Sequence, residues 1–140
     1  MRITGLSFGV LLFSMAALAA EETPFARIAD LASAFSENDP DGVLRIFDPQ
    51  MKDYGAIEAY VEALSAQTDV SCAIDVVSDQ VSGGVHKLDL DWFMQLTTQN
   101  DNPQVERRRE RVRVEMTQIK GRWKITALTP LSIFEPIHVR

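Results

Sequence analysis

The feature of this sequence that most constrains its fold is a change of hydrophobic period near Thr68. Before that point apolar residues recur at three- and four-residue spacing, which is typical of helices, and after it they alternate with polar residues, as in half-buried strands. This order predicts helices that cover one face of an antiparallel sheet, an α+β architecture. A chain of 140 residues with 46% hydrophobic residues has room for one domain with a substantial core.

Three helices are predicted in the first half of the chain, over residues 24–36, 40–47 and 55–66. Asp39 precedes the second helix and Asp53 precedes the third, and both residue types are favoured as N-caps. Each helix has an apolar face for the core. The residues on these faces are Phe25, Ile28, Leu31, Ala32, Phe35, Val43, Leu44, Phe47, Ile57, Tyr60, Val61 and Leu64.

Four strands are predicted in the second half, over residues 68–77, 86–96, 105–119 and 123–127. Turn sequences separate them: Ser82-Gly83-Gly84, Asn100-Asp101-Asn102-Pro103 and Lys120-Gly121. The inward-facing residues of the last strand are expected to be Trp123, Ile125 and Ala127.

Charge predicts the register between these strands, because like charges placed opposite each other destabilise a sheet. We expect the cross-strand pairs Lys87–Glu115, Asp89–Arg113, Asp91–Arg111, Leu88–Val114 and Leu90–Val112, and in the last hairpin Ile125–Met116 and Ala127–Val114. The outer face then carries an arginine stripe made of Arg107, Arg109, Arg111 and Arg113. We interpret this stripe as a solvated or cross-paired face; the alternative is an anion or nucleic-acid patch.

The first twenty residues predict an export signal. Arg2 precedes an apolar run from Ile3 to Leu18, and Ala17 and Ala19 form a small-residue cleavage site before Ala20 or Glu21. We therefore expect a secreted or periplasmic mature domain over residues 21–140, with no membrane association after cleavage. The alternative is an uncleaved anchor.

Composition excludes several classes of function. The net charge of −6 and pI of about 4.8 exclude nucleic-acid binding through general electrostatics. His86 and His138 are the only histidines and have no metal-ligand spacing, so we expect no metal and no cofactor. Cys72 is the only cysteine, and its apolar neighbours indicate a small buried hydrophobe rather than a catalytic thiol.

Four short segments resemble conserved pieces of nuclear transport factor 2-like (SnoaL-like) domains. Ala34–Asp39 and Leu44–Pro49 are similar to the first helix and the following turn, Gly55–Tyr60 to a G-x-x-A-I helix start, and Gly121–Ile125 to a G-x-W-x-I final strand. The resemblance implies a cone-shaped, curved antiparallel sheet of about four strands covered by three N-terminal helices. Family members usually insert a strand and loop where this chain has only Gln50–Tyr54, so part of a pocket wall is expected to be missing.

The resemblance also implies a site, because enzymes of this superfamily use a cavity inside the cone. The best catalytic candidates are then His86 as a base and Tyr60 as a donor. Each candidate also has a structural interpretation: a buried histidine bonded to a backbone carbonyl or a histidine at the open end of its strand, core aromatics, and charges that pair with neighbours or stay solvated. The full set of candidate ligand-binding residues is Tyr54, Tyr60, His86, Trp92, Arg108 and Glu110.

These observations favour an exported small-ligand-binding or accessory module without enzymatic activity. The alternatives are an isomerase or lyase acting on a small hydrophobic carbonyl compound, and a protein–protein assembly domain. The resemblance implies a homodimer through the outer sheet face, where Phe93 and Leu128 are expected to point outward. The apolar tail, residues 131–140, is expected to pack on the domain's own sheet edge or on another chain.

Overall fold

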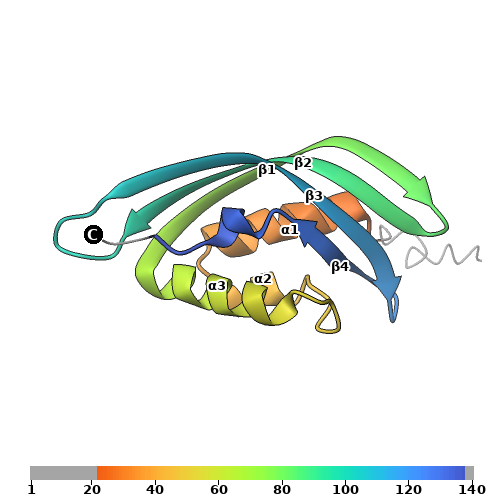
Figure 1. Cartoon of the computed structure of the whole chain (residues 1–140), viewed down its shortest axis with the longest axis horizontal. Coiled ribbons are helices and arrows are strands. Elements are labelled where there is room, and N and C mark those ends of the chain that lie inside the picture. Colours follow the sequence, from red (N-terminus) through yellow and green to blue (C-terminus); the bar gives the residue numbers. More distant parts are fainter. Residues whose placement is uncertain (1–21, 138–140) are drawn as a thin grey trace, which may run out of the picture.

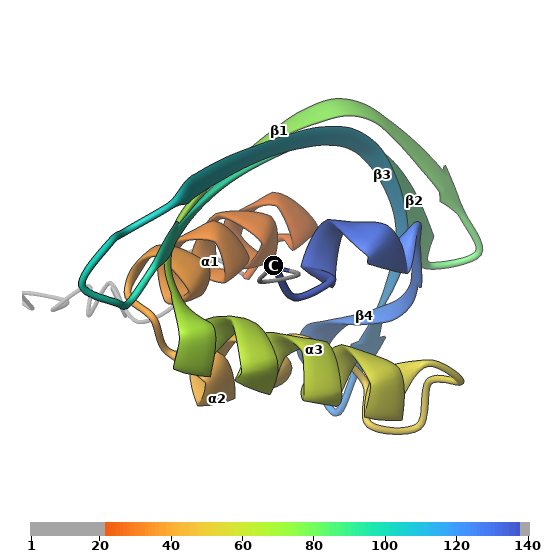
Figure 2. The ribbon, with the colours of Figure 1, turned by 60° about the vertical axis from the view of Figure 1, so that its left-hand side comes forward.

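The computed structural model describes residues 22–137, and the predicted α+β architecture is confirmed. Three helices lie under a four-stranded sheet that arches over them (Figures 1 and 2). The predicted signal and residues 138–140 of the tail lie outside the described part. The elements are α1 (Pro24–Ser36), α2 (Pro40–Leu44), α3 (Tyr54–Gln67), β1 (Thr68–Ser82), β2 (Val85–Thr98), β3 (Val105–Ile119), β4 (Arg122–Thr129) and the 3-10 helix η2 (Leu131–Phe134).

The sheet is an antiparallel meander in the order β1-β2-β3-β4. The register predicted between β2 and β3 is confirmed, from His86 opposite Met116 to Thr97 opposite Val105. On the outer face Arg113 lies 3.1 Å from Asp89, and Arg109 lies 2.7 Å from Asp91. Hydrogen bonds from these arginines hold the pKa of both aspartates below the usual range. The arginine stripe is thus cross-paired and exposed, as predicted.

The register predicted for the end of the last hairpin is wrong. A β-bulge places Ile125 opposite Met116 but Ala127 opposite Glu115, so Thr126 is the extra residue on β4. Beyond the bulge Leu128, rather than Ala127, faces Val114. Leu128 is consequently 1% exposed and points into the core, which contradicts its predicted place on the outer face.

The helix starts follow the predicted chemistry with one exception. Asp39 caps α2 by accepting a 3.0 Å hydrogen bond from the Gly42 N–H, but Asp53 makes no side-chain cap bond to α3. The second helix is also shorter than predicted, because the chain after Leu44 pairs with the edge of β4. The N–H of Ile125 donates to the Ile46 carbonyl, and its own carbonyl accepts from the Asp48 N–H.

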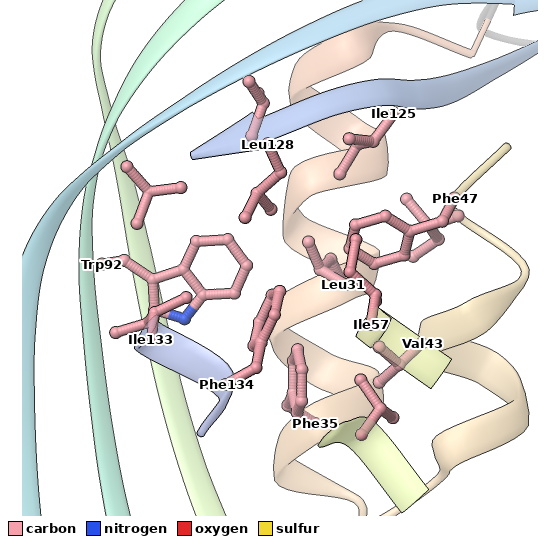
Figure 3. Close-up of a cluster of buried hydrophobic side chains, with 14 of the residues drawn as sticks. Leu31, Phe35, Val43, Phe47, Ile57, Trp92, Ile125, Leu128, Ile133 and Phe134 are labelled. Carbon is pink, nitrogen blue, oxygen red and sulfur yellow. The ribbon is translucent and has the colours of Figure 1, made fainter. Parts of the chain in front are cut away.

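The core lies between the sheet and the helices, and the C-terminal segment is part of it. Trp92, Phe35 and Phe47 surround the ring of Phe134 (Figure 3). Ile133 and Phe134 are both 0% exposed. The prediction that the tail packs on a sheet edge or on another chain is therefore wrong for η2, which lies inside the cone.

Candidate functional site

The interior of the cone, where the resemblance implied a ligand cavity, is occupied by side chains. Phe134 stacks on Phe35 with ring centroids 5.6 Å apart, and meets Phe47 and Trp92 edge-on at 6.2 and 5.3 Å. Because these rings touch one another, η2 takes up the space that a ligand would need. Of these four aromatic residues, Phe47 alone lines one of the main surface grooves of residues 22–137.

Arg108 and Glu110 hold this segment in place from β3. The Nη1 atom of Arg108 donates a 3.1 Å hydrogen bond to the carbonyl of Ile133, and its guanidinium also pairs with Glu106 at 2.7 Å. The carboxylate of Glu110 accepts a 3.1 Å hydrogen bond from the Ser132 hydroxyl. These two candidate ligand residues therefore bind the chain's own C-terminal helix.

Replacing Arg108 with methionine should lower the free energy of unfolding by about 1–2 kcal/mol, because the Ile133 carbonyl loses its donor. Urea denaturation measures the change. The matched control is Arg107→Met, which removes an exposed arginine whose side chain donates a hydrogen bond to Gln95 on the outer face. Equal stability of the two variants would contradict the anchoring role of Arg108.

The side chain of His86, near the start of β2, contacts two neighbouring side chains. Its Nδ1 lies 2.9 Å from a carboxylate oxygen of Asp79, and its ring packs edge-on against Trp123 at 4.8 Å. The Trp123 indole N–H in turn donates to the Glu22 carbonyl at 3.0 Å. The partner of His86 is thus a carboxylate, rather than the backbone carbonyl that the structural interpretation expected.

Trp92 and Tyr60 belong to the core or its rim. Trp92 is 0% exposed, and its indole N–H has no regular hydrogen-bond partner within residues 22–137. Tyr60 is half-buried and packs against the core from α3. Neither side chain lines a main groove of the described chain, so the structure does not bring them together with His86 in one site.

Cys72 is half-buried on β1, and burial raises the pKa of its thiol to about 12. The nearby Trp92 indole acts in the opposite direction by a smaller amount. Because the thiolate is the reactive form of cysteine, this shift lowers the reactivity of the Cys72 thiol at neutral pH. The pKa of this thiol is higher in the folded state than its unfolded value of about 8.5. The contribution of Cys72 to the free energy of unfolding is therefore fully present below about pH 8.5 and is lost as the pH rises toward 12.

We expect Cys72 of the folded protein to react with a thiol reagent at pH 8 roughly a hundredfold or more slowly than in the urea-unfolded chain, since so little thiolate forms. With a reagent that releases a coloured thiol on reaction, the absorbance of that product measures the rate for the folded and for the unfolded chain. Equal rates would contradict the burial of this side chain.

Tyr54 is the one candidate residue that lines a main groove of the described chain. This groove of about 420 Å³ is lined by residues of α2, α3 and β4, and its charged residues are Asp41, Arg45, Glu58, Glu62 and Lys124. Burial and the two glutamates raise the pKa of Tyr54, while burial and nearby arginines lower the pKa of Lys124. Sequence reasoning missed the glutamates, although their i+4 and i+8 spacing from Tyr54 places them on the same side of α3.

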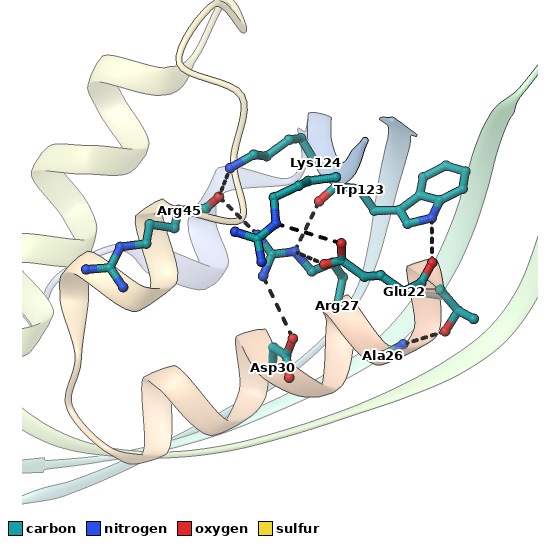
Figure 4. A network of polar contacts seen from close by, with 9 residues as sticks. Glu22, Ala26, Arg27, Asp30, Arg45, Trp123 and Lys124 are labelled. Carbon is teal, nitrogen blue, oxygen red and sulfur yellow. Dashed lines mark hydrogen bonds and ion pairs between the residues drawn. The ribbon is translucent and has the colours of Figure 1, made fainter. Parts of the chain in front are cut away.

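A second polar cluster, also missed from the sequence, joins α1, α2 and β4 around Arg27 (Figure 4). The Arg27 side chain is 10% exposed, pairs with Glu22 at 2.9 Å, and donates to the carbonyls of Trp123 and Arg45 at 3.2 and 3.3 Å. Lys124 donates to the same Arg45 carbonyl. Arg27 thus donates hydrogen bonds to two backbone carbonyls, one at the end of α2 and one on β4, and this role is structural.

Within residues 22–137 no group of three or more histidine, cysteine, aspartate or glutamate side chains could hold a metal ion. No helix in the same range is long and apolar enough to cross a membrane.

Comparison with solved structures defines the fold. The chain is similar to a nuclear transport factor 2-like superfamily protein from Salmonella enterica, with a TM-score of 0.62 and 16% identity over 73% of this chain and 82% of that one. The chain has a nuclear transport factor 2-like fold. A scytalone dehydratase-like protein from Novosphingobium aromaticivorans shares this fold at a TM-score of 0.64 and 13% identity, over 91% of this chain and 89% of that one.

The chain is also similar to a conserved protein from Planctomyces limnophilus, with a TM-score of 0.64 and 8% identity over 73% of this chain and 87% of that one. No protein-family model matches the sequence, and the comparison with curated proteins finds no match either. Identities this low establish the fold alone.

Proposed function

We propose that this protein is an exported accessory module without enzymatic activity, which acts through its surface rather than through a cavity in the cone. The observation that carries the proposal is the complete burial of Ile133 and Phe134 inside the cone. A substrate bound there would have to displace these two fully buried side chains. The segment that carries them is held from β3 by Arg108, which binds the Ile133 carbonyl, and by Glu110, which binds the Ser132 hydroxyl.

The placement of His86 supports the non-enzymatic proposal over an isomerase or lyase. A general base must reach the proton that it removes, within hydrogen-bond distance or through one water. His86 lines none of the main grooves of residues 22–137, and its ring packs edge-on against Trp123, so none of these grooves brings a substrate to it. The dehydratase-like relative supports only the shared fold, since its chemistry depends on its own side chains.

A second candidate function is binding of a small polar ligand in the groove beside Tyr54. The groove is lined by the carboxylates of Asp41, Glu58 and Glu62 and by the cations of Arg45 and Lys124, so it presents both charges to one small molecule. We therefore propose a zwitterion of amino-acid size as the class of ligand.

Native mass spectrometry of the protein from its own exported fraction tests the proposal. We expect a chain that begins near residue 21 and carries no small molecule in the cone. A co-purified apolar compound lost on His86→Ala would contradict the proposal and favour the enzyme alternative. A polar compound lost on Tyr54→Phe and Lys124→Met, but retained in the control Lys120→Met, would instead establish the groove beside Tyr54 as the site.

A further inference from the structure

A second groove lies between the end of the β3–β4 hairpin and the turn that follows α2. It is lined by residues 48–50 of the turn and by Ile119, Lys120, Arg122 and Lys124 of the hairpin. Its volume of about 550 Å³ falls within the range of small-molecule sites. We call it the hairpin groove.

Backbone pairing fixes both sides of the hairpin groove. The turn is held to β4, because the Asp48 N–H donates a 2.9 Å hydrogen bond to the Ile125 carbonyl. On the other side Ile119 pairs with Arg122 across the two-residue turn Lys120-Gly121, whose residues have φ values of 53° and 80°. Two positive φ values are typical of a tight hairpin turn that continues the twist of its strands. The groove is therefore formed before any ligand arrives.

The hairpin groove carries more positive than negative charge. Lys120, Arg122 and Lys124 contribute three cations, and Asp48 contributes the one carboxylate. Within residues 22–137 neither lysine forms an ion pair, and Arg122 reaches only Glu22, at 3.9 Å. The cations of the groove are thus free to meet a ligand.

The electrostatic state of Lys124 agrees with this excess of positive charge. Burial and the charges of Arg27 and Arg122 lower the pKa of its ammonium group, and Glu22 and Asp48 offset only part of this effect. The potential at the groove is therefore positive, although the whole chain carries a net charge of −6. Such a local field attracts anions.

The same groove also offers apolar surface. Pro49 is exposed and Ile119 is half-buried, and both line the groove. The methylene stem of Lys120 adds to this surface, because long cationic side chains keep only their charged end in water. A ligand with an apolar body would remove this surface from water, which an inorganic anion would not do.

We propose that the hairpin groove binds a small organic anion, a carboxylate that carries an apolar chain. Lys120 and Arg122 would bind the carboxylate, and the apolar chain would lie over Ile119 and Pro49. A small ligand interacts mainly with charges within about 8 Å of it, whereas an anionic membrane surface would also face many carboxylates of this acidic chain. This inference goes beyond the proposed function, because neither export nor the filled cone enters it.

Isothermal titration calorimetry with octanoate below its micellar concentration tests the site. We expect octanoate to bind with a dissociation constant below about 1 mM, as a ligand of its size can. Acetate lacks the apolar chain and octanol lacks the charge, so we expect each of them to bind at least tenfold more weakly. A protein that does not bind octanoate, or that binds acetate or octanol equally well, overturns the proposal.

A pair of matched double variants makes the test specific. Lys120→Met combined with Arg122→Met removes two exposed cations of the groove and should weaken octanoate binding tenfold or more, with circular dichroism unchanged. Arg107→Met combined with Arg111→Met removes two exposed cations of the outer sheet face and should leave the affinity unchanged. Since both pairs change the net charge equally, the same affinity in the two double variants overturns the proposal.

Two further measurements separate the hairpin groove from other sites. On the unchanged protein, octanoate should shift the backbone amide signals of residues 48–50 and 119–124. Shifts confined to the core around Phe134, or to the groove beside Tyr54, would contradict the proposal. We expect no binding to phosphatidylglycerol vesicles, and vesicle binding that the groove double variant abolishes would assign the groove to a membrane surface and overturn the proposal.

Discussion

Replacing Phe134 with alanine is expected to lower the free energy of unfolding by about 3–5 kcal/mol, the cost of removing a fully buried phenylalanine from a packed core. Phe134 is 0% exposed and contacts the rings of Phe35, Phe47 and Trp92. Chemical denaturation of the mature domain measures the change. Since single domains are stable by about 5–15 kcal/mol, this loss is a large fraction of the total stability.

The control is Val105→Ala, which removes a large apolar side chain that is 51% exposed on β3. We expect this control to cost less than about 1 kcal/mol, as surface substitutions usually do. If Phe134→Ala and Val105→Ala were equally mild, η2 would not be part of the core, and the proposal that the cone is filled would be wrong.

Arg27→Met is expected to produce the second large effect, a loss of about 2–3 kcal/mol of unfolding free energy. Methionine preserves the length of the buried stem but leaves the Trp123 carbonyl without its donor and Glu22 without its 2.9 Å partner. The Arg45 carbonyl keeps its hydrogen bond from Lys124. The loss of unfolding free energy is therefore smaller than it would be if every partner of Arg27 lost its hydrogen bond. Thermal unfolding followed by circular dichroism gives the comparison.

Arg109→Met serves as the control for Arg27. Arg109 pairs with Asp91 at 2.7 Å, but its side chain is 73% exposed, so water replaces the lost interaction and stability should change little. A variant series in which Arg109→Met destabilises the fold more than Arg27→Met would show that surface pairs, rather than the cluster around Arg27, support this corner of the molecule.

The sheet was largely predictable because two independent patterns agree on it. Alternation assigned Leu90 and Val112 to the inner face, and opposite charges aligned Asp89 with Arg113 across the same two strands. A slip of register would disturb both patterns, which is why the whole β2–β3 ladder could be predicted from a few pairs.

The errors arise where the chain departs from constant periodicity. The extra residue Thr126 changes the side on which the following residues lie, and nothing in the alternation marks it. Leu128 was placed outside for this reason. The tail was misplaced because its short apolar run has no period of its own, so only the space left between Phe35 and Trp92 decides where Phe134 packs.

The candidate site was less predictable, since its contacts join distant segments. The roles of Arg108 and Glu110 depend on Ile133 and Ser132, more than twenty residues away in sequence. Their inward direction could be predicted from strand parity, but the partner could not. Tyr54 was the one candidate that reached a groove, and its neighbours Glu58 and Glu62 carried a helical spacing that could have identified them.

The most direct test of a filled cone is a nuclear Overhauser measurement on the mature protein with aromatic side chains labelled. The account predicts cross-peaks from the ring protons of Phe134 to those of Phe35 and to the Trp92 indole, whose ring centroids lie 5.6 and 5.3 Å away. A spectrum in which Phe134 shows no contact with either ring, and shifts like a solvent-exposed phenylalanine, would contradict it.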